Sequence, residues 1–530
     1  MKTRAYRFAR RLAQVVTLTA ALHAGVQTER PGSGPVLRPD SFRHYFTDFA
    51  RDEREMLGSA PPLPWQWFVD NIPWLDTPDT EINQIYYFRW YGFQKHISHT
   101  PDGYVITEFL DHVPWAGKFN TIDAAAGHQI REARWLRDAV YVDDYTRFWF
   151  GPDGQPRLYS FWAADSVYQV YLATGNRQLA VSLLPALEDN YRRWAATHQD
   201  TNGLFWQIDD RDGMEDSISG NGYRPTINSY MYGDAVAISR IAAMAGDPEI
   251  ATQYREEASR LRELIESRLW NPHDEFYETM ARHGSSGWSG VRELIGYIPW
   301  YFNIPPHQHD VAWKFLLLRE GFAGKYGPTT AERSSLRFRY QMNHECLWNG
   351  PSWPYATTQT LVALANLLNG PKQSAVTTGD YFRLLSTYTR SQHIRLPAGQ
   401  TIPWIDEDLD ADTGDWIARN ILVARHALPE NRGRYYNHSG YADLIITGLI
   451  GLRPQPGNEI VVHPLLPSGT WSYFALDGLP YHGHLLTILY DRTGQRYHRG
   501  KGFQILCDGS VIAHTDTLQN LRAELPDQGR

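Results

Sequence analysis

YMYGDAVAISRIAAMAGDPEIATQYREEASRLRELIESRL, residues 230–269, holds two amphipathic segments separated by a Gly-Asp-Pro turn. Apolar residues recur in both segments at the three- and four-residue spacing of one helix face. This pattern predicts one helix over residues 230–245 and a second over residues 248–269. Because proline is tolerated in the first turn of a helix and glycine just after its end, the break predicts a helical hairpin.

Similar segments follow one another from about residue 120 to about residue 450, joined by short loops rich in Gly, Pro, Asn and Asp. Further predicted helices cover residues 121–137, 162–172, 177–198, 353–368, 378–391 and 441–449. Helix pairs at this spacing, with acidic residues gathered in the connecting loops, predict a toroid of helical hairpins and a mainly α fold. A plain helical solenoid is the alternative, but its connections would repeat more regularly.

Smaller regions are predicted on either side of a helical barrel that covers residues 119–452. Residues 41–118 mix helix-like and strand-like segments, and we expect them to pack on the barrel. β-like runs at 459–462, 471–475, 485–490 and 503–507 are bounded by Gly, Pro and Asp. They predict a small β-rich C-terminal domain over residues 453–530.

The first 24 residues have the layout of a secretory signal peptide. MKTRAYRFARR carries five basic residues and no acidic one, and LAQVVTLTAALHA at 12–24 is short and mostly apolar. This predicts a periplasmic or secreted protein. A non-targeting amphipathic leader, and hence a cytoplasmic protein, is the alternative. Residues 25–40, GVQTERPGSGPVLRPD, are predicted to be a flexible linker.

The composition fits a folded globular chain of 530 residues, 42% hydrophobic and 21% charged. A net charge of −8 without a long basic run argues against a nucleic-acid partner. The 19 Trp and 31 Tyr residues suit stacking on sugar rings as well as core packing. Cys346 and Cys507 lie far apart and are expected to be free thiols. No segment after the leader is long and apolar enough to predict a membrane span.

Two clusters of carboxylates interrupt the helical pattern. One is DDRDGMEDSISG at 209–220, and the other is TIPWIDEDLDADTGDW at 401–416. Hydrolysis of a glycosidic bond requires two carboxyl groups on opposite sides of one sugar, and they can come from distant parts of a chain. The two clusters are therefore predicted to supply such a pair.

Four stretches carry a resemblance to a known group of enzymes. They are SFWAADSVY at 160–168, DGMEDS at 212–217, LWNGPSWP at 347–354 and IDEDLDADTGDW at 405–416. With these stretches in this order and at this spacing, residues 75–515 resemble bacterial glycoside hydrolases grouped with mannosylglycerate hydrolase, the trehalases and glycoside hydrolase family 63. The resemblance implies an (α/α)6 barrel and hydrolysis with inversion at the anomeric carbon.

The resemblance also implies the catalytic residues. The general acid of the group is an Asp in a Gly-x-Asp-x-Ser pattern, and Glu215 holds that place here, one methylene longer. The acid is therefore Glu215 or its neighbour Asp216. The base of the group precedes a Thr-Gly pair, which implies Glu407, with Glu345 as the alternative base.

Candidate substrate-binding residues come from the same stretches and from the aromatic and charged residues near them. They are Trp162, Asp165, Arg134, Trp206, Asp212, Trp348, Asn349, Trp353 and Trp404. Asn349 stands where the group has an Arg, which removes a cationic fork and bears on the choice of substrate. For each candidate the alternative role is structural: a core Trp, an ion pair on a helix face or a capped turn.

Calcium is an alternative ligand for the second acidic cluster. Asp408, Asp410 and Asp412 have the spacing of an EF-hand loop, but Gly414 falls one place late. The twelfth position is Arg419 instead of a bidentate Glu, which argues against an EF-hand. A structural calcium site of another kind stays open, and no organic cofactor is expected.

The sequence as a whole predicts an inverting, exo-acting glycoside hydrolase on α-linked gluco- or manno-type or related oligosaccharides. A polysaccharide lyase or sugar epimerase on the same toroid is one alternative, although such chemistry calls for a Tyr or His base. A non-catalytic carbohydrate-binding protein is the other.

Overall fold

A computed structural model describes residues 34–58, 60–283, 287–396, 399–427 and 431–526. The predicted signal peptide and residues 25–33 of the predicted linker lie outside the described residues. Among the described residues, no helix combines the length and apolar character needed to cross a bilayer.

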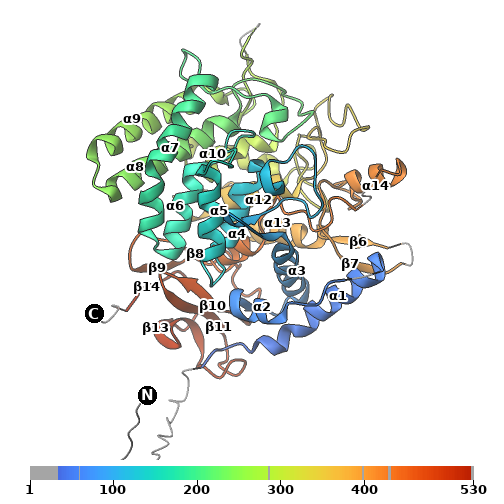
Figure 1. Ribbon diagram of the computed structural model, residues 1–530, viewed down its shortest axis with the longest axis vertical. Coiled ribbons are helices and arrows are strands. Elements are labelled where there is room, and N and C mark those ends of the chain that lie inside the picture. Colours follow the sequence, from blue (N-terminus) through green and yellow to red (C-terminus); the bar gives the residue numbers. More distant parts are fainter. Residues whose placement is uncertain (1–33, 59, 284–286, 397–398, 428–430, 527–530) are drawn as a thin grey trace, which may run out of the picture.

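Helices are the predominant secondary structure of the described residues (Figure 1). The N-terminal region contains α1 (Arg43–Leu57), α2 (Trp65–Asn71) and α3 (Thr80–His96). The following helices are α4 (Ala126–Ala133), α5 (Val140–Phe150), α6 (Ala163–Thr174), α7 (Arg177–His198), α8 (Pro225–Ala245), α9 (Pro248–Leu264), α10 (Ile298–Tyr301), α11 (Lys314–Leu317), α12 (Pro354–Asn369), α13 (Thr378–Ser391) and α14 (Ile417–Ala424). Short 3-10 or π turns are η1 (Pro39–Phe42), η2 (Lys118–Asn120), η3 (Asp123–Ala125), η4 (Asp209–Asp212), η5 (Ile265–Leu269), η6 (Leu294–Tyr297), η7 (His307–Trp313) and η8 (Leu444–Leu449).

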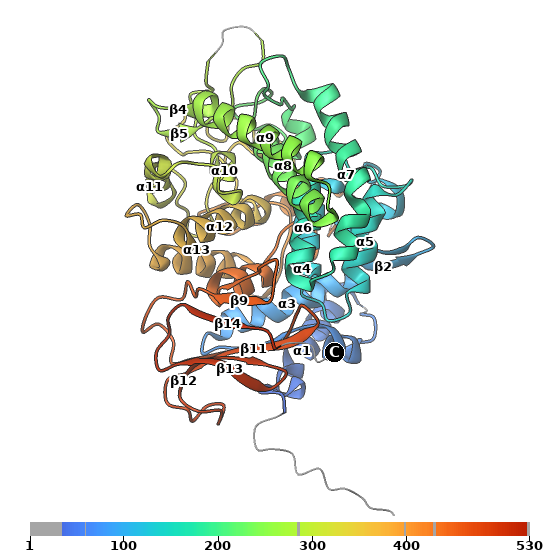
Figure 2. The ribbon, with the colours of Figure 1, turned by 90° about the vertical axis from the view of Figure 1, so that its left-hand side faces the viewer.

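The helices from α4 onward form an (α/α)6 barrel, which confirms the predicted fold class. The inner helices α6, α8 and α12 are buried almost all round, and α12 contains no charged residue. The outer helix α9 is amphipathic, with Ala251, Tyr254, Ala258 and Leu261 forming its buried stripe. Antiparallel neighbours such as α8 and α9 lie side by side in both views (Figures 1 and 2). Composition therefore sorts the helices into an apolar inner ring and an amphipathic outer ring.

Helix ends follow the sequence signals in most cases. Helices α7 and α13 begin and end at the predicted residues. Helix α8 begins at Pro225, five residues before the predicted start, because proline is well suited to the first helical turn. The helix predicted over 121–137 is shorter, since the chain tightens into turns after Ala133 and the Arg137 amide donates to the Asn71 carbonyl instead. The predicted helix at 441–449 is the π turn η8.

The C-terminal region is a β-structure that also takes in part of the N-terminal region. One antiparallel sheet has the order β1-β10-β11-β12-β13, and a second has the order β14-β9-β8. Their strands are β1 (Trp74–Asp76), β8 (Leu452–Arg453), β9 (Glu459–Val462), β10 (Tyr473–Tyr481), β11 (His484–Asp491), β12 (Gly502–Cys507), β13 (Ser510–Thr515) and β14 (Leu521–Glu524). The two-stranded ribbons are β2 (Ile97–Thr100) with β3 (Gly103–Ile106), β4 (Trp270–Asn271) with β5 (Phe276–Tyr277), and β6 (His393–Arg395) with β7 (Thr401–Pro403).

Strand β1 joins the two ends of the chain. Leu75 pairs with Leu476 of β10, and an ion pair of 2.9 Å between Asp76 and Arg496 reinforces this edge. Figure 2 shows the blue N-terminal helices next to the red C-terminal strands, at one end of the molecule below the barrel. The N-terminal region is thus held by the C-terminal sheet as well as by the helices.

A layer of aromatic rings fills the middle of the barrel. The ring of Trp162 at the start of α6 lies 4.9 Å from Tyr230, 5.3 Å from Tyr301 and 5.1 Å from His128, measured between centroids. Gly127 of α4 lies directly against Trp162, where a Cβ atom would come within 2.3 Å of an indole carbon. Glycine at this position lets α4 approach the indole.

Gly127→Ala is therefore expected to destabilise the barrel. The added methyl meets a rigid, fully buried indole, and overpacking of this kind costs about 1–3 kcal/mol. Thermal unfolding followed by circular dichroism should show a lower melting temperature. Gly379→Ala in α13 is the matched control, because its Cβ would have only the Thr377 hydroxyl within 4 Å, at 3.3 Å. It should be neutral or stabilising, since alanine favours a helix over glycine. Equal melting temperatures for Gly127→Ala and the wild type would contradict the packing argument.

Candidate active site

A cavity of about 420 Å³ lies where the inner helices begin. Ala124 before α4 and Tyr355 at the start of α12 contribute to its wall. Its carboxyl-bearing residues include Glu108, Glu215, Glu345 and Glu407, and its aromatic residues include Trp115, Tyr159, Trp348, Trp353, Tyr355 and Tyr436. The structure thus brings residues from both acidic clusters of the sequence to one cavity.

The loop after η4 places Glu215. Gly213, in the left-handed region with φ 67°, turns the chain out of η4, and the Glu215 carbonyl accepts from the Trp348 amide at 3.0 Å. Below the loop, a fully buried ion pair of 2.6 Å joins Asp212 to Arg224. Asp212 therefore anchors the loop from beneath, and the Glu215 side chain lines the cavity.

Burial sets the protonation of Glu215. Desolvation raises the pKa of Glu215 to about 7, and the negative charges of Asp210 and Glu407 add to the rise. The Cys346 thiol donates to Glu215 Oε2 at 2.8 Å and opposes it, because a hydrogen bond to the carboxylate favours the charged form. The pKa of Glu215 thus lies much closer to neutral pH than that of an exposed glutamate.

The adjacent carboxyl of Asp216 faces elsewhere. Asp216 has a positive φ of 59° and accepts a hydrogen bond from Gln341 Nε2 at 3.0 Å. It does not line the cavity. The geometry therefore favours Glu215 over Asp216 as the residue that can reach a ligand there.

Glu407 is held by backbone pairing and by an arginine. Leu409, two residues further on, pairs with Ser352 through backbone hydrogen bonds of 2.8 and 2.9 Å, which joins the second acidic cluster to the GPSWP loop. Glu407 Oε1 accepts from Arg432 Nη2 at 2.6 Å. Burial raises the pKa of Glu407, and the Arg432 charge opposes that rise. Within the described part of the chain, Glu407 thus has a cationic partner and Glu215 has none.

Two further carboxyls stand in the cavity wall. Glu345 forms an ion pair of 3.0 Å with Arg425 and lies 3.9 Å from Arg432. Glu108 was not among the predicted residues. Burial raises its pKa to about 8, and the charges of Glu407 and Glu215 contribute. The signal that could have identified Glu108 is its position as a lone acid in the apolar run VITEFL.

Two of the predicted substrate-binding residues, Trp348 and Trp353, line the cavity. Their rings stack at 4.6 Å with an interplanar angle of 16°. The Trp353 indole donates to the Leu347 carbonyl at 2.7 Å, which fixes the pair. A flat indole surface of this kind can pack against the face of a sugar ring.

The remaining predicted substrate-binding residues lie outside this cavity. Asn349 donates to the Gln341 carbonyl, Trp206 stacks on His198, and Trp404 donates to Asp406. Trp162 belongs to the aromatic layer, and Arg134 and Asp165 lie beyond that layer at the other end of the barrel. Each of these side chains already has protein partners, so their placement favours the structural alternative over contact with a ligand in this cavity.

The second acidic cluster pairs its loop carboxylates with arginines. Asp410 accepts from Arg339 at 2.7 Å, and Asp412 accepts from Arg333 at 2.9 Å. Asp408 is buried and accepts from the Ala418 amide at 3.0 Å. Arginines therefore pair with Asp410 and Asp412, and the Ala418 amide at the start of α14 pairs with one oxygen of Asp408.

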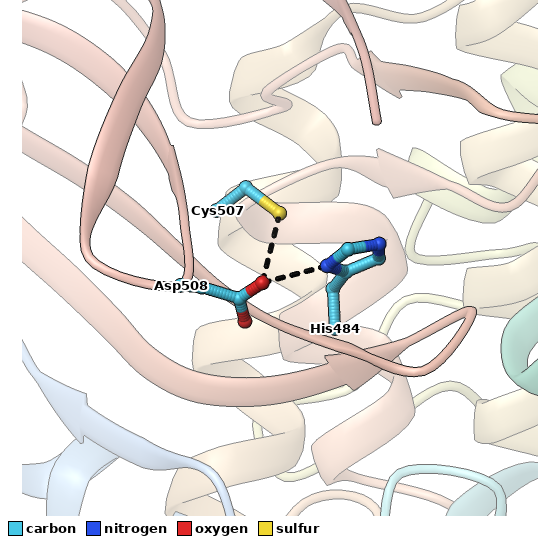
Figure 3. A group of neighbouring side chains, drawn as sticks. All are labelled: His484, Cys507 and Asp508. Atoms are coloured by element: carbon cyan, nitrogen blue, oxygen red, sulfur yellow. Dashed lines mark hydrogen bonds and ion pairs between the residues drawn. The ribbon is translucent and has the colours of Figure 1, made fainter. Parts of the chain in front are cut away.

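Within the described part of the chain, one group of side chains has the proximity of metal ligands, and it lies in the C-terminal sheet (Figure 3). Asp508 accepts from His484 Nδ1 at 2.6 Å, and Cys507 Sγ lies 3.8 Å from the same carboxylate. Burial raises the pKa of Cys507 to about 11, so the thiolate that binds metals is disfavoured. Cys346 and Cys507 are both free thiols, as expected.

Carboxyl groups from separate loops, walled by aromatic rings at one end of an (α/α)6 barrel, are the groups that hydrolysis of a glycosidic bond requires. A family model described as the mannosylglycerate hydrolase MGH1-like glycoside hydrolase domain matches residues 118–439. The chain belongs to this family of enzymes that hydrolyse glycosidic bonds. A second model, the glycosyl hydrolase family 65 C-terminal domain, matches residues 452–514.

Solved structures and curated proteins show further similarity. A structure named "Sialidase" is 42% identical, with a TM-score of 0.85, over 92% of this chain and 45% of that chain. An uncharacterized conserved protein from Thermus thermophilus shares 12% identity and the fold, with a TM-score of 0.50, over 68% of this chain and 98% of that one. An uncharacterized protein of Borreliella burgdorferi is 24% identical over 162 residues, 30% of this chain and 34% of that protein. The chain thus spans less than half the length of the first and the last of these.

Glu215→Gln should stabilise the protein at alkaline pH. Because the folded-state pKa of Glu215 is raised to about 7, the folded protein holds this proton while the unfolded chain loses it near pH 4.5. The stability that the proton provides is complete below the unfolded pKa and is lost as the pH rises through the folded pKa. Relative to the wild type, the glutamine variant should gain roughly 1–3 kcal/mol at pH 8 and little at pH 4.5.

Thermal melts of both proteins at the two pH values measure this difference. Glu256→Gln, on the exposed face of α9, is the control and should stay within about 0.5 kcal/mol of the wild type at both. A gain for Glu215→Gln that is as large at pH 4.5 as at pH 8 would show that the effect is not the buried charge.

Proposed function

We propose that this protein is an inverting, exo-acting glycoside hydrolase with Glu215 as general acid and Glu407 as general base. The observation that carries the proposal is the unequal environment of two carboxyls on one cavity. Glu215 is buried with a thiol as its hydrogen-bond donor, whereas Glu407 is paired with Arg432. Such enzymes use two carboxyl groups whose surroundings give them different pKa values. One group then acts as the acid and the other as the base.

The acid must carry a proton that it can give to the leaving oxygen. A pKa of about 7 keeps a large fraction of Glu215 protonated near neutral pH. A bound sugar would displace solvent from the cavity and favour the neutral form further. Glu215 could then protonate the glycosidic oxygen as the bond to the anomeric carbon breaks.

The base must be ionised so that it can take a proton from the attacking water. Arg432 stabilises the charged form of Glu407 at 2.6 Å. The second guanidinium nitrogen faces Glu345 at 3.9 Å, so Arg432 stands between the proposed base and the alternative base. We assign the base to Glu407 because its arginine contact is the shorter one and its side chain is the more deeply buried.

A cavity of about 420 Å³ suits one end of a sugar chain better than its middle, which supports exo action. The stacked Trp348 and Trp353 would face the ring of an α-linked gluco- or manno-type sugar. The name "Sialidase" belongs to a longer chain, and an acidic sugar would need a cation for its carboxylate. Arg432 already serves two carboxylates, and Arg211, which also lines the cavity, lies 3.4 Å from Asp210, so a neutral sugar fits the cavity better.

A lyase or epimerase on this barrel would need a Tyr or His base. Burial raises the pKa of Tyr436 far above its ordinary range, so the phenolate that a Tyr base would use is disfavoured at the cavity. This supports hydrolysis over a lyase or epimerase with a Tyr base. We further propose that the reaction needs no organic cofactor and that the leader exports the enzyme to the periplasm or the medium.

Leaving-group dependence tests the two roles. Glu215→Gln should lower kcat/KM by roughly 10²–10⁴-fold on oligosaccharides and much less on aryl glycosides with activated leaving groups, which need little protonation. Glu407→Gln should be impaired on both kinds of substrate, because the water still has to be deprotonated. Proton NMR of the first product should show the anomer opposite to that of the substrate. Asp216→Asn, the neighbouring carboxyl outside the cavity, is the control and should remain active.

A first product with the same anomeric configuration as the substrate would mean that the second carboxylate acts as a nucleophile and not as a base. A product with a new double bond would favour the lyase. Loss of activity in Glu345→Gln with a normal Glu407→Gln would move the base to Glu345.

The thiol contact gives a separate prediction for the pH profile. The hydrogen bond from Cys346 lowers the pKa of Glu215, so Cys346→Ala should raise it. Since the acid must be protonated, the alkaline limb of kcat/KM should move to higher pH by about 0.5–1 pH unit, the value of a weak hydrogen bond. Cys346→Ser keeps a donor and should leave the limb near or below its wild-type position. Movement to lower pH in Cys346→Ala would contradict the assignment of that limb to Glu215.

A further inference from the structure

A second cavity of about 370 Å³ lies at the opposite end of the barrel. It is lined by residues late in the inner helices, such as Arg131 in α4, Gln169 in α6, Arg240 in α8 and Asn366 in α12. The first cavity lies where these helices begin. The two cavities therefore occupy the two ends of the helical ring.

The aromatic layer separates the two cavities. Tyr355 lines the first cavity and its ring lies 4.7 Å from His128, which in turn lies 5.1 Å from Trp162. Trp162 lies 5.3 Å from Tyr301, which lines the second cavity. A ligand at one end therefore does not touch the residues proposed for catalysis at the other.

The second cavity is rich in positive charge. Arg131, Arg134, Arg240 and Arg453 line it, and the carboxylates in contact with them are Asp165 and Asp443. Among the described residues, four guanidinium groups thus share two carboxylates, which is an excess of two positive charges. Arg262 also lines the cavity, but it pairs with Glu266 at 3.2 Å and is not part of this excess.

Arg453 carries much of the uncompensated charge. It follows η8 in β8 and donates to Asn366 Oδ1 at 2.6 Å, and it forms no ion pair with any residue that the structure describes. Burial lowers the pKa of Arg453 to about 10, and the neighbouring charge of Arg131 contributes. Because a buried cation without a counter-ion is costly, a bound anion here would be favourable.

The other arginines differ in depth. Arg134 is almost fully buried, pairs with Asp443 at 2.7 Å, and has an Nε group without a hydrogen-bond partner among the described residues. Arg240 is exposed, which shows where the cavity reaches solvent. A ligand could thus enter past Arg240 and meet Arg453 and Arg131 inside.

We propose that this cavity is a binding site for a phosphate group, either free or as the ester of a small sugar. Guanidinium forks match the oxygens of phosphate, and a phosphate ester carries close to two negative charges at neutral pH, equal to the excess in the cavity. The volume exceeds that of the anion alone. Tyr232, Tyr301 and Phe302 provide apolar surface on which the rest of a sugar phosphate can pack.

Calorimetric titration of the full protein tests the site. Inorganic phosphate and glucose 6-phosphate are the probes, glucose is the neutral control, and ionic strength is kept constant with sodium chloride. We expect one binding site for the phosphate-bearing probes and none for glucose at this cavity. Tighter binding of glucose 6-phosphate identifies the sugar ester as the ligand, and equal affinity identifies the free anion.

Variants then locate the binding. Arg453→Gln keeps a donor for Asn366 and should weaken binding at least about tenfold, the effect of one lost charge-assisted hydrogen bond. Arg240→Gln at the exposed mouth, where folding is not at stake, should weaken it about threefold to tenfold. Arg255→Gln, exposed on α9, is the matched control and should bind as the wild type does. Glu215→Gln should also bind normally, because the aromatic layer separates the cavities.

Two results would overturn the proposal. One is the absence of binding of both phosphate probes to the wild type at millimolar concentration. The other is wild-type affinity for the phosphate probes in both Arg453→Gln and Arg240→Gln. This result would mean that the anion binds elsewhere and that the arginines have only a structural role at the helix ends. Neither result bears on the proposed hydrolysis, whose test uses the other cavity.

Discussion

The packing of Trp162 in the middle of the barrel is the constraint on which the other features depend. Protein interiors are close-packed, and this indole with Tyr230, Tyr301 and His128 fills the space that the inner helices enclose. The two cavities consequently lie at the two ends of the helical ring, one on each side of this layer. The carboxyl-lined cavity and the arginine-lined cavity are the two results of this division.

The buried carboxyl groups that would carry the reaction at the first cavity are unfavourable for folding when they are charged. Glu108 and Glu215 both have raised pKa values because the cavity wall removes water from them. Three loops from distant parts of the chain hold these groups in place through specific contacts, such as the Trp348 amide on the Glu215 carbonyl. The arginine on Glu407 then makes this carboxylate different from Glu108 and Glu215. Selective pairing, more than burial alone, separates the two proposed roles.

Local patterns in the sequence predicted the helices well and the long-range contacts poorly. The periodicity of α7 and α13 is contained within each helix, so their bounds could be predicted from neighbouring residues. Strand β1 pairs with β10 some four hundred residues later, and no local pattern indicates that partner. The motifs that suggested Glu215 and Glu407 identified two residues of the cavity. The same kind of motif could not show that Trp162 and Asp165 lie below it, since a motif fixes neighbours along the chain but not the cavity that each side chain faces.

The helix ring itself gives its two ends opposite electrostatic character. The partial positive charge at helix N-termini favours carboxylates at the first cavity, and the partial negative charge at C-termini favours arginines at the second. The dipoles should therefore lower the pKa of acids near the N-terminal end, by an interaction of about 0.3–1 kcal/mol each. The pKa of Glu215 is nevertheless raised to about 7. Desolvation by the cavity wall must therefore affect the pKa of Glu215 more than the helix dipoles do. Protonation of Glu215 then depends mainly on how completely loop residues such as Cys346 and Trp348 exclude water, and less on the barrel helices.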